Sequence, residues 1–280
     1  MLTASIRVIV HSNVLISLSA TSLAVSTVLL ADLSIEPVPL FIVFSVTMFV
    51  YSYNRIADFA EDSKNIPERA SFVSRYGRSL LGVGIVLYGL ATALAVLRGI
   101  PAAPAMGIPL AVAVLYSGVG LKRVLLVKNL LVGLSWGLIP VGIGIYYGEL
   151  WTTDVLFVAA FSTVMLTIAA AVFDIKDIEG DSAAGIDTLP VLYGPGVTRR
   201  LAVGATAVVA LLVLVLVWAG VLEPVYLLFE AFLAYVAGYS LFATADRGPL
   251  FYGFVIDGEH IFLAVLLLLA TGVSRGVFAF

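Results

Sequence analysis

The sequence predicts an all-α integral membrane protein with about nine transmembrane helices. Of its 280 residues, 61% are hydrophobic and only 12% are charged, whereas soluble domains carry about 25% charged residues. Apolar runs of roughly 20 residues, the length that a helix needs to cross a bilayer, recur along the whole chain. The basic residues between these runs are also concentrated in every second loop, as they are in membrane proteins.

The predicted spans follow one another with short polar connections. The first apolar run has no small-residue cleavage site, so we expect a retained helix rather than a signal peptide. The fourth run is short and the ninth begins with charged residues, so eight spans is an alternative count. We place the spans near residues 12–31, 37–56, 78–97, 104–120, 129–148, 154–173, 200–219, 224–243 and 258–275.

The distribution of basic residues predicts how the chain is oriented in the membrane. If loops alternate between the two sides of the membrane, 13 of the 15 lysine and arginine residues fall on the side that holds the N-terminus. Only Arg98 and Arg275 fall on the other side. Because loops rich in lysine and arginine stay in the cytosol, we expect the N-terminus to face the cytosol.

The two largest polar segments, 54–78 and 174–200, lie on this predicted cytosolic side and resemble each other. Each has an Asp-x-x-x-Asp-Ser sequence near its start, beginning at Asp58 and at Asp177, and each contains a later Tyr-Gly pair. Membrane proteins built from internal repeats often hold their site where the repeats meet. The chain is therefore predicted to contain two quasi-repeated four-helix units.

Composition excludes several classes of site. The chain has no cysteine, which excludes disulfides, thiolate catalysis, iron–sulfur clusters and cysteine–zinc sites. Its two histidines, His11 and His260, are far apart in sequence. No basic tract indicates nucleic-acid binding.

Carboxylates recur at helical spacing in both polar segments. Asn54, Asp58 and Asp62 are four residues apart, and Asp174, Asp177 and Asp181 are three and four apart. If each helix continues through its motif, each trio lies on one helix face. Like charges on one face repel, and a bound Mg²⁺ would offset the repulsion because it prefers carboxylate and phosphate oxygens. The alternative is that both clusters are solvated loop charges.

Basic residues near the clusters suit a diphosphate, which arginine and lysine bind together with metal ions. The alternative for each of them is anchoring at the cytosolic face of the membrane. The candidates for diphosphate binding next to the two motifs are Lys64, Arg69 and Lys176.

The two segments resemble the paired motifs of the UbiA-type intramembrane prenyltransferases. The stretch from Asn54 to Arg69 is similar to the first motif of that family. The stretch from Asp174 to Gly194 is similar to the second. Arg55 departs from the family, which often has aspartate there, and Arg69 is followed by Ala-Ser-Phe rather than by Pro and a small-residue turn.

The resemblance implies one domain over residues 1–280, with helices around a central cavity under a cytosolic cap. It implies Mg²⁺-dependent transfer of a prenyl group from a polyprenyl diphosphate to a lipophilic acceptor through an allylic carbocation. The partners are then these two substrates and membrane lipid, with no nucleic acid and no required protein partner.

The same resemblance assigns roles to residues of this chain. The catalytic residues are Asp58, Asp62, Asp177 and Asp181, and Asn54 and Asp174 join them as metal ligands. Tyr116 and Lys122 join the three basic candidates at the diphosphate. Candidates for contacts with substrate are His11, Asn13, Tyr51 and Asn129. Candidate aromatic lining groups are Tyr51, Tyr53, Phe59, Tyr116, Trp136 and Phe173.

Two other function classes stay open. Paired acidic clusters also suit a cation-coupled transporter, although transporter acids usually lie near the midplane of the bilayer. A UbiA-like terpene cyclase would ionise the same substrate without an acceptor. The sequence leaves open the acceptor, the prenyl chain length and the roles of Glu230, Asp257, Glu259 and His260.

Overall fold

The structure is a computed structural model that describes residues 2–59, 67–101, 103–111 and 125–274. Within these ranges every regular element is a helix, as the sequence predicts. The elements of the first half are α1 (Leu2–His11), α2 (Val14–Leu30), α3 (Pro37–Ala57), α5 (Pro67–Leu97), η1 (Ala103–Met106) and α7 (Val127–Tyr147). Those of the second half are α8 (Thr153–Phe173), η3 (Asp174–Asp177), α9 (Ile178–Ala183), α10 (Leu189–Tyr193), α11 (Pro195–Trp218), η4 (Pro224–Leu227), α12 (Leu228–Phe242), η5 (Phe251–Ile256) and α13 (Glu259–Ser274).

Helices long and apolar enough to cross a membrane make up most of the described chain. There are seven of them, or eight if the bent pair α1 and α2 counts as one span. These ranges therefore support an integral membrane protein but not the predicted count of nine. Part of the fourth predicted span, 104–120, lies outside the described residues.

The structure adds to the predicted helices at two places. The first predicted span, 12–31, corresponds to α2, and the chain bends by 71° just before it, between α1 and α2. Asn13 sits at this break with a left-handed φ of 64°, which asparagine tolerates better than most residues. Helix α5 begins at Pro67, well before residue 78. Proline suits the first position of a helix, and Glu68 in the first turn favours the helix dipole.

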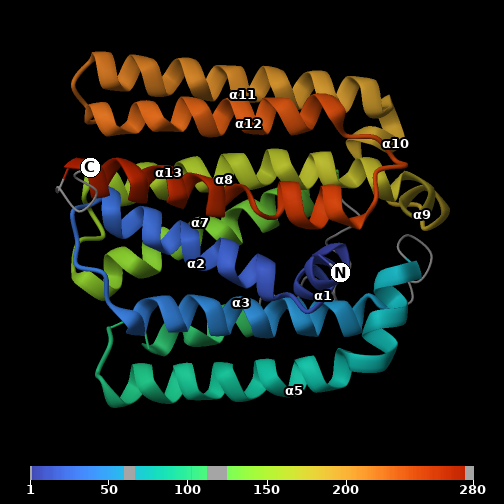
Figure 1. The fold of residues 1–280 in the computed structure, drawn as a ribbon, viewed down its shortest axis with the longest axis horizontal. Helices are drawn as coiled ribbons and strands as arrows, with labels where there is room; N and C mark the ends of the chain where they lie inside the picture. The colour runs from blue at the N-terminus through green and yellow to red at the C-terminus, as the bar shows by residue number, and fades with distance from the viewer. Residues whose placement is uncertain (1, 60–66, 102, 112–124, 275–280) are drawn as a thin grey trace.

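The helices are arranged in three groups (Figure 1). Helices α11 and α12 pack together along one side of the bundle, and α3 and α5 pack along the other. Between these pairs lie α2, α7, α8 and α13. The short helices α9 and α10, the N-terminus and the start of α5 gather at one end of the bundle.

Glycines bring some of these helices close together. A Cβ atom at Gly133 of α7 would lie 2.2 Å from Thr167 Oγ1 of α8, and one at Gly84 of α5 would lie 2.9 Å from Phe49 Cα of α3. Backbone approach through small residues is the usual way in which transmembrane helices associate.

The two acidic motifs follow α3 and α8, but in different ways. Helix α3 ends at Ala57, and Asp58 is its C-cap. Helix α8 ends at Phe173, and the chain continues through the 3₁₀ turn η3 into α9. The second motif is therefore helical throughout, whereas the first leaves its α-helix at Asp58.

Candidate active site

Both acidic motifs line one polar cavity. Its volume is about 290 Å³, and its lining includes Asn54 and Asp58 from the first motif and Asp174, Asp177 and Asp181 from the second. The structure thus brings together two segments that are distant in sequence, as the paired-motif hypothesis requires. The cavity lies where the end of α3 meets η3 and α9.

Asn54, in the first motif, has a buried amide oxygen that could contact a metal ion. Its Oδ1 atom is buried, and no described residue forms a hydrogen bond with it. A buried polar atom without a partner destabilises a folded chain, and one that belongs to a residue lining a polar cavity is a candidate contact for a bound ion or water. An amide oxygen here, beside Asp58, suits a hard cation.

The second motif is held by two residues at the start of α7. Lys128 Nζ lies 2.9 Å from Asp174 Oδ1 and 3.3 Å from Asp181 Oδ2. Asn129 Nδ2 donates a hydrogen bond of 2.9 Å to Asp174 Oδ2. Both aspartates are nearly fully buried, so the ammonium group compensates two charges that would otherwise repel.

Lys128 is not among the site residues that the sequence predicts. The available signal was its position directly before Asn129, at the start of an apolar run. Leu126 precedes α7 with a left-handed φ of 63°, and this turn brings Lys128 into the first turn of the helix. Which carboxylates it reaches depends on the packing of α7 on α8.

Further basic side chains surround the acids. Lys176 is paired with Asp177, and Arg55 and Arg69 also line the cavity. Arg69 comes from the first turns of α5 and is only 5% exposed. The cavity therefore combines carboxylates with guanidinium and ammonium groups, which is the charge pattern that a metal-bound diphosphate needs.

A third wall of the cavity is formed by Asp257, Glu259 and His260, whose roles the sequence left open. They lie where the π-helix η5 gives way to α13. Gly258 permits this turn, because a Cβ there would lie 2.4 Å from the carbonyl oxygen of Phe254. Short π-helices often occur at functional sites.

The structure does not bring every predicted residue to the cavity. His11 packs its ring 5.7 Å from that of Phe72, and Asn13 donates a 3.2 Å hydrogen bond to Ser52. Neither of them lines either of the two cavities described here. Both residues lie at the bend between the two helices, where His11 ends α1 and Asn13 directly precedes α2. The predicted residues Asp62, Lys64, Tyr116 and Lys122 lie outside the described residues.

Among the described residues, no group of three or more histidine, aspartate or glutamate side chains is close enough to hold a metal ion. The residues Asn54, Asp58, Asp174, Asp177 and Asp181 nevertheless line one cavity. Mg²⁺ is usually bound by one or two carboxylates, with phosphate oxygens and waters completing its coordination. The donor set therefore fits Mg²⁺ that arrives together with a phosphate-bearing substrate.

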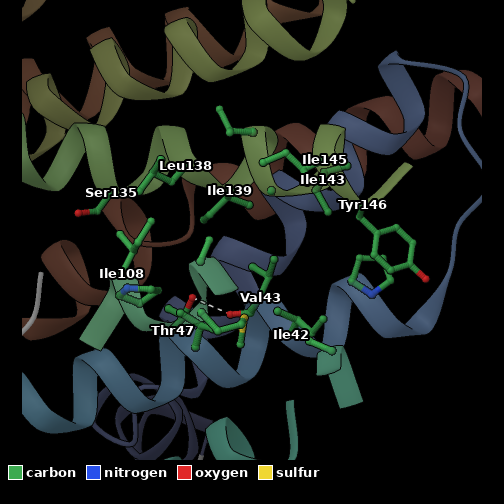
Figure 2. Close-up of a pocket in the computed structure, with 18 of the residues that line it drawn as sticks. Ile42, Val43, Thr47, Ile108, Ser135, Leu138, Ile139, Ile143, Ile145 and Tyr146 are labelled. Atoms are coloured by element: carbon green, nitrogen blue, oxygen red, sulfur yellow. Dashed lines mark hydrogen bonds between the residues drawn. The ribbon is translucent and has the colours of Figure 1, made fainter. Parts of the chain in front are cut away.

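An apolar cavity of about 300 Å³ adjoins the polar one. It runs along α7 from Ser135 to Tyr146 and is closed on the α3 side by residues such as Ile42 and Val43 (Figure 2).

The residues that line both cavities are Val50, Tyr51, Ser135 and Trp136. Trp136 Nε1 donates a 3.2 Å hydrogen bond to Tyr51 at this boundary. Of the other aromatic candidates, Phe173 lines the polar cavity, whereas Tyr53 and Phe59 line neither.

Comparison with known proteins agrees with this arrangement. The family model of the UbiA prenyltransferase family matches residues 14–250. A relative from Methanobrevibacter smithii, named digeranylgeranylglyceryl phosphate synthase, is 37% identical over 84 residues, which is 30% of each chain. A relative of the same name from Methanothermobacter thermautotrophicus is 29% identical over 188 residues, which is 66% of each chain. The matches thus span 30% and 66% of the lengths of these relatives.

Solved structures share the fold. The apo structure of a UbiA homolog from Aeropyrum pernix K1 has a TM-score of 0.65 at 17% identity, covering 92% of this chain and 98% of that one. The structure of a UbiA homolog from Archaeoglobus fulgidus bound to GPP and Mg²⁺ has a TM-score of 0.60 at 15% identity, covering 90% and 95%. With the family match over most of the chain, the conclusion is that this protein belongs to the UbiA prenyltransferase family.

Proposed function

We propose that the protein transfers a prenyl group from a polyprenyl diphosphate to a lipophilic acceptor in a Mg²⁺-dependent reaction. The observation that carries this proposal is that both acidic motifs and four basic side chains line one cavity, with an apolar cavity directly beside it. The first cavity suits the charged head of the substrate. The second suits the start of its hydrocarbon tail.

The proposed metal ligands are Asn54, Asp58, Asp174, Asp177 and Asp181, together with Asp62 outside the described residues. Mg²⁺ at this site would stabilise the negative charge that develops on the departing diphosphate. Asn54 Oδ1, which is buried and has no hydrogen-bond partner among the described residues, supports this assignment. The similar structure described as bound to GPP and Mg²⁺ supports it as well.

The basic residues of the chain bind and orient the diphosphate in this proposal. Lys128, Lys176, Arg55 and Arg69 line the described cavity, and the predicted Lys64, Tyr116 and Lys122 would add to them. The allylic C–O bond breaks with its electron pair leaving on the diphosphate oxygen. An acceptor nucleophile then bonds to the allylic carbon and loses a proton.

Aromatic side chains would protect the cation. Tyr51, Trp136 and Phe173 line the polar cavity, and the face of an aromatic ring attracts a cation. Trp136 and Tyr51 also stand at the border with the apolar cavity, where the first isoprene units would lie. A site from which water is excluded prevents hydrolysis of the intermediate.

The placement in the membrane follows from the same proposal. Residues 1–280 form a single domain, and the polar cavity opens at the cytosolic end of the bundle, where the basic residues gather. The tail of the substrate remains in the apolar cavity and the lipid. The name of the two relatives refers to a glyceryl phosphate product, which supports a glyceryl phosphate lipid as the acceptor class.

The test is transfer by the purified chain in detergent. We expect labelled geranylgeranyl diphosphate and Mg²⁺ to give diphosphate and a prenylated product with one of a panel of lipid and aromatic acceptors. Chelation of Mg²⁺ should reduce release by at least about 100-fold, since metal stabilisation of charge is worth several kcal/mol. Release that persists at full rate in the chelator would contradict the proposal.

The transporter alternative predicts a different result. Both motifs follow the ends of α3 and α8 rather than lying at the middle of a span, which disfavours a transport site at the midplane. In proteoliposomes, cation uptake without any turnover of the prenyl diphosphate would favour transport over transfer.

Lys128 is expected to stabilise the folded protein when no metal ion is bound. Lys128→Met removes an ammonium group that lies within ion-pair distance of both Asp174 and Asp181, and removing one partner of a buried ion pair is strongly destabilising. We expect a loss of about 3 kcal/mol in chelator, measured by thermal unfolding in detergent. Mg²⁺ should recover part of the loss. Equal unfolding temperatures of variant and wild type in chelator would show that the bridge does not stabilise the site.

A further inference from the structure

We infer that Glu259 and His260 form the acceptor subsite, where Glu259 binds a hydroxyl group of the acceptor and takes its proton. This inference rests on the proposed prenyl transfer and names the nucleophile that the reaction uses. It concerns a wall of the polar cavity that the acidic motifs do not supply. The acceptor is therefore a lipid with a free hydroxyl group, and the product is an ether.

The first observation is that Glu259 and His260 are buried while some of their polar atoms have no hydrogen-bond partner among the described residues. Glu259 is 1% exposed and His260 is 0% exposed, yet both line the polar cavity. Within the described part of the chain, Glu259 Oε1 and both ring nitrogens of His260 lack a hydrogen-bond partner. Glu259 Oε1 lies 3.5 Å from His260 Nδ1, which is too long for a good hydrogen bond. A carboxylate oxygen and an imidazole without partners in a cavity wall suit a ligand with a hydroxyl group, which can both donate and accept a hydrogen bond.

Support from neighbouring helices is the second observation. Tyr239 of α12 donates a 2.6 Å hydrogen bond to Glu259 Oε2, so one carboxylate oxygen is occupied and Oε1 is left for a ligand. The His260 ring lies 5.3 Å from the Trp136 ring of α7 and 5.6 Å from the Phe232 ring of α12. Side chains held in this way are preorganised for binding.

The third observation is that Glu259 and His260 lie near the border between the polar and apolar cavities. Trp136 touches the His260 ring and also lines the border between the polar and apolar cavities. A hydroxyl group at Glu259 would therefore stand near the place where the diphosphate head and the prenyl tail meet. Reacting groups must be held close together for transfer to compete with water.

The chemical step balances without any further reactant. The acceptor oxygen forms a bond to the allylic carbon, while the bond from that carbon to the diphosphate oxygen breaks and its electron pair leaves with the diphosphate. The acceptor O–H bond breaks, its electrons stay on the ether oxygen, and the proton moves to Glu259 Oε1. An aromatic acceptor that reacts at a ring carbon has no O–H at the reacting atom and would not use this contact.

The decisive experiment compares Glu259→Gln with Glu230→Gln in the full chain. Glutamine keeps the shape of the side chain but cannot take a proton. Glu230 of α12 also has a buried Oε1 that no residue of the described ranges hydrogen-bonds, but it lines neither cavity, which makes it a matched control. The probes are geranylgeranyl diphosphate with Mg²⁺, and a monoalkyl glyceryl phosphate or its O-methylated analogue as acceptor.

We expect Glu259→Gln to lower ether formation at least 50-fold while its affinity for a prenyl thiolodiphosphate with Mg²⁺ stays within twofold of wild type. Glu230→Gln should transfer normally, and the methylated acceptor should be inert. If Glu259→Gln does not fold, the Tyr239→Phe variant tests the inference instead. It should lower kcat about fivefold with little change in KM, because Tyr239 only positions the carboxylate.

The failures are distinguishable. If wild type makes product and folded Glu259→Gln retains it within threefold, the inference is overturned and prenyl transfer stands. Wild-type turnover with an aromatic acceptor alone, or an unchanged kcat in Tyr239→Phe when that variant decides, would overturn the inference as well. If wild type neither binds nor cleaves the prenyl diphosphate, the proposed function itself is wrong.

Discussion

Replacing Asp58 or Asp177 by alanine is expected to lower Mg²⁺-dependent diphosphate release by at least about 1000-fold, the scale of losing preorganised charge stabilisation. Each substitution removes a carboxylate from one side of the same cavity. The remaining motif would have to neutralise the departing diphosphate alone. Release of labelled diphosphate from geranylgeranyl diphosphate measures the effect.

A binding measurement separates loss of the site from loss of the fold. Wild type should unfold at a higher temperature when a prenyl thiolodiphosphate and Mg²⁺ are added together, because ligands that bind only the folded state stabilise it. Both variants should lose most of this shift. Asp246→Ala is the matched control, since Asp246 is an exposed aspartate that does not line the cavity. Unchanged turnover in either cavity variant would defeat the assignment of the metal site.

Gly133→Ala is the change expected to damage the fold most. The added Cβ would lie 2.2 Å from Thr167 Oγ1 and 2.3 Å from the carbonyl oxygen of Thr163. The threonine side chain can rotate, but the carbonyl belongs to the backbone of α8 and cannot move away without shifting the helix. Overpacking of this kind costs about 3 kcal/mol, and we expect a fall of that size in thermal unfolding experiments in detergent.

The same substitution should also reduce transfer, because it separates helices that carry the site. Helix α7 supplies Lys128 and Asn129, and α8 leads directly to Asp174. Gly204→Ala in α11 is the control, as its Cβ would meet open space, and alanine favours the helix slightly more than glycine does. A Gly133→Ala protein as stable as the Gly204→Ala protein would show that α7 and α8 are less tightly packed than the structure indicates.

Some differences between prediction and structure have a local cause. The bend between α1 and α2 lies at the start of the first predicted span, and hydropathy does not mark it. The bend is made by Asn13 in a left-handed conformation, which is a matter of backbone geometry rather than composition. The early start of α5 was missed because its first turns carry Glu68, Arg69 and Arg75, which resemble loop residues on a hydropathy scale.

Other differences concern contacts between distant helices. That Lys128 reaches two aspartates, that Trp136 touches both cavities and that Glu259 faces the polar cavity all depend on how α7, α8, α12 and α13 pack. Spacing within a helix indicates which residues share a face. It does not indicate which neighbouring helix that face meets.

The sequence by itself determined that the chain is a helical membrane protein, where most of its helices lie and which two motifs carry the acids. These properties follow from the length of apolar runs and from helical periodicity, both of which are local. Only the tertiary structure decided that the motifs share one cavity, that lysines compensate their charges, and that Glu259 and His260 form a further wall while His11 and Asn13 do not. Contacts between separate helices are set by the close packing of their side chains, and no single stretch of sequence contains that information.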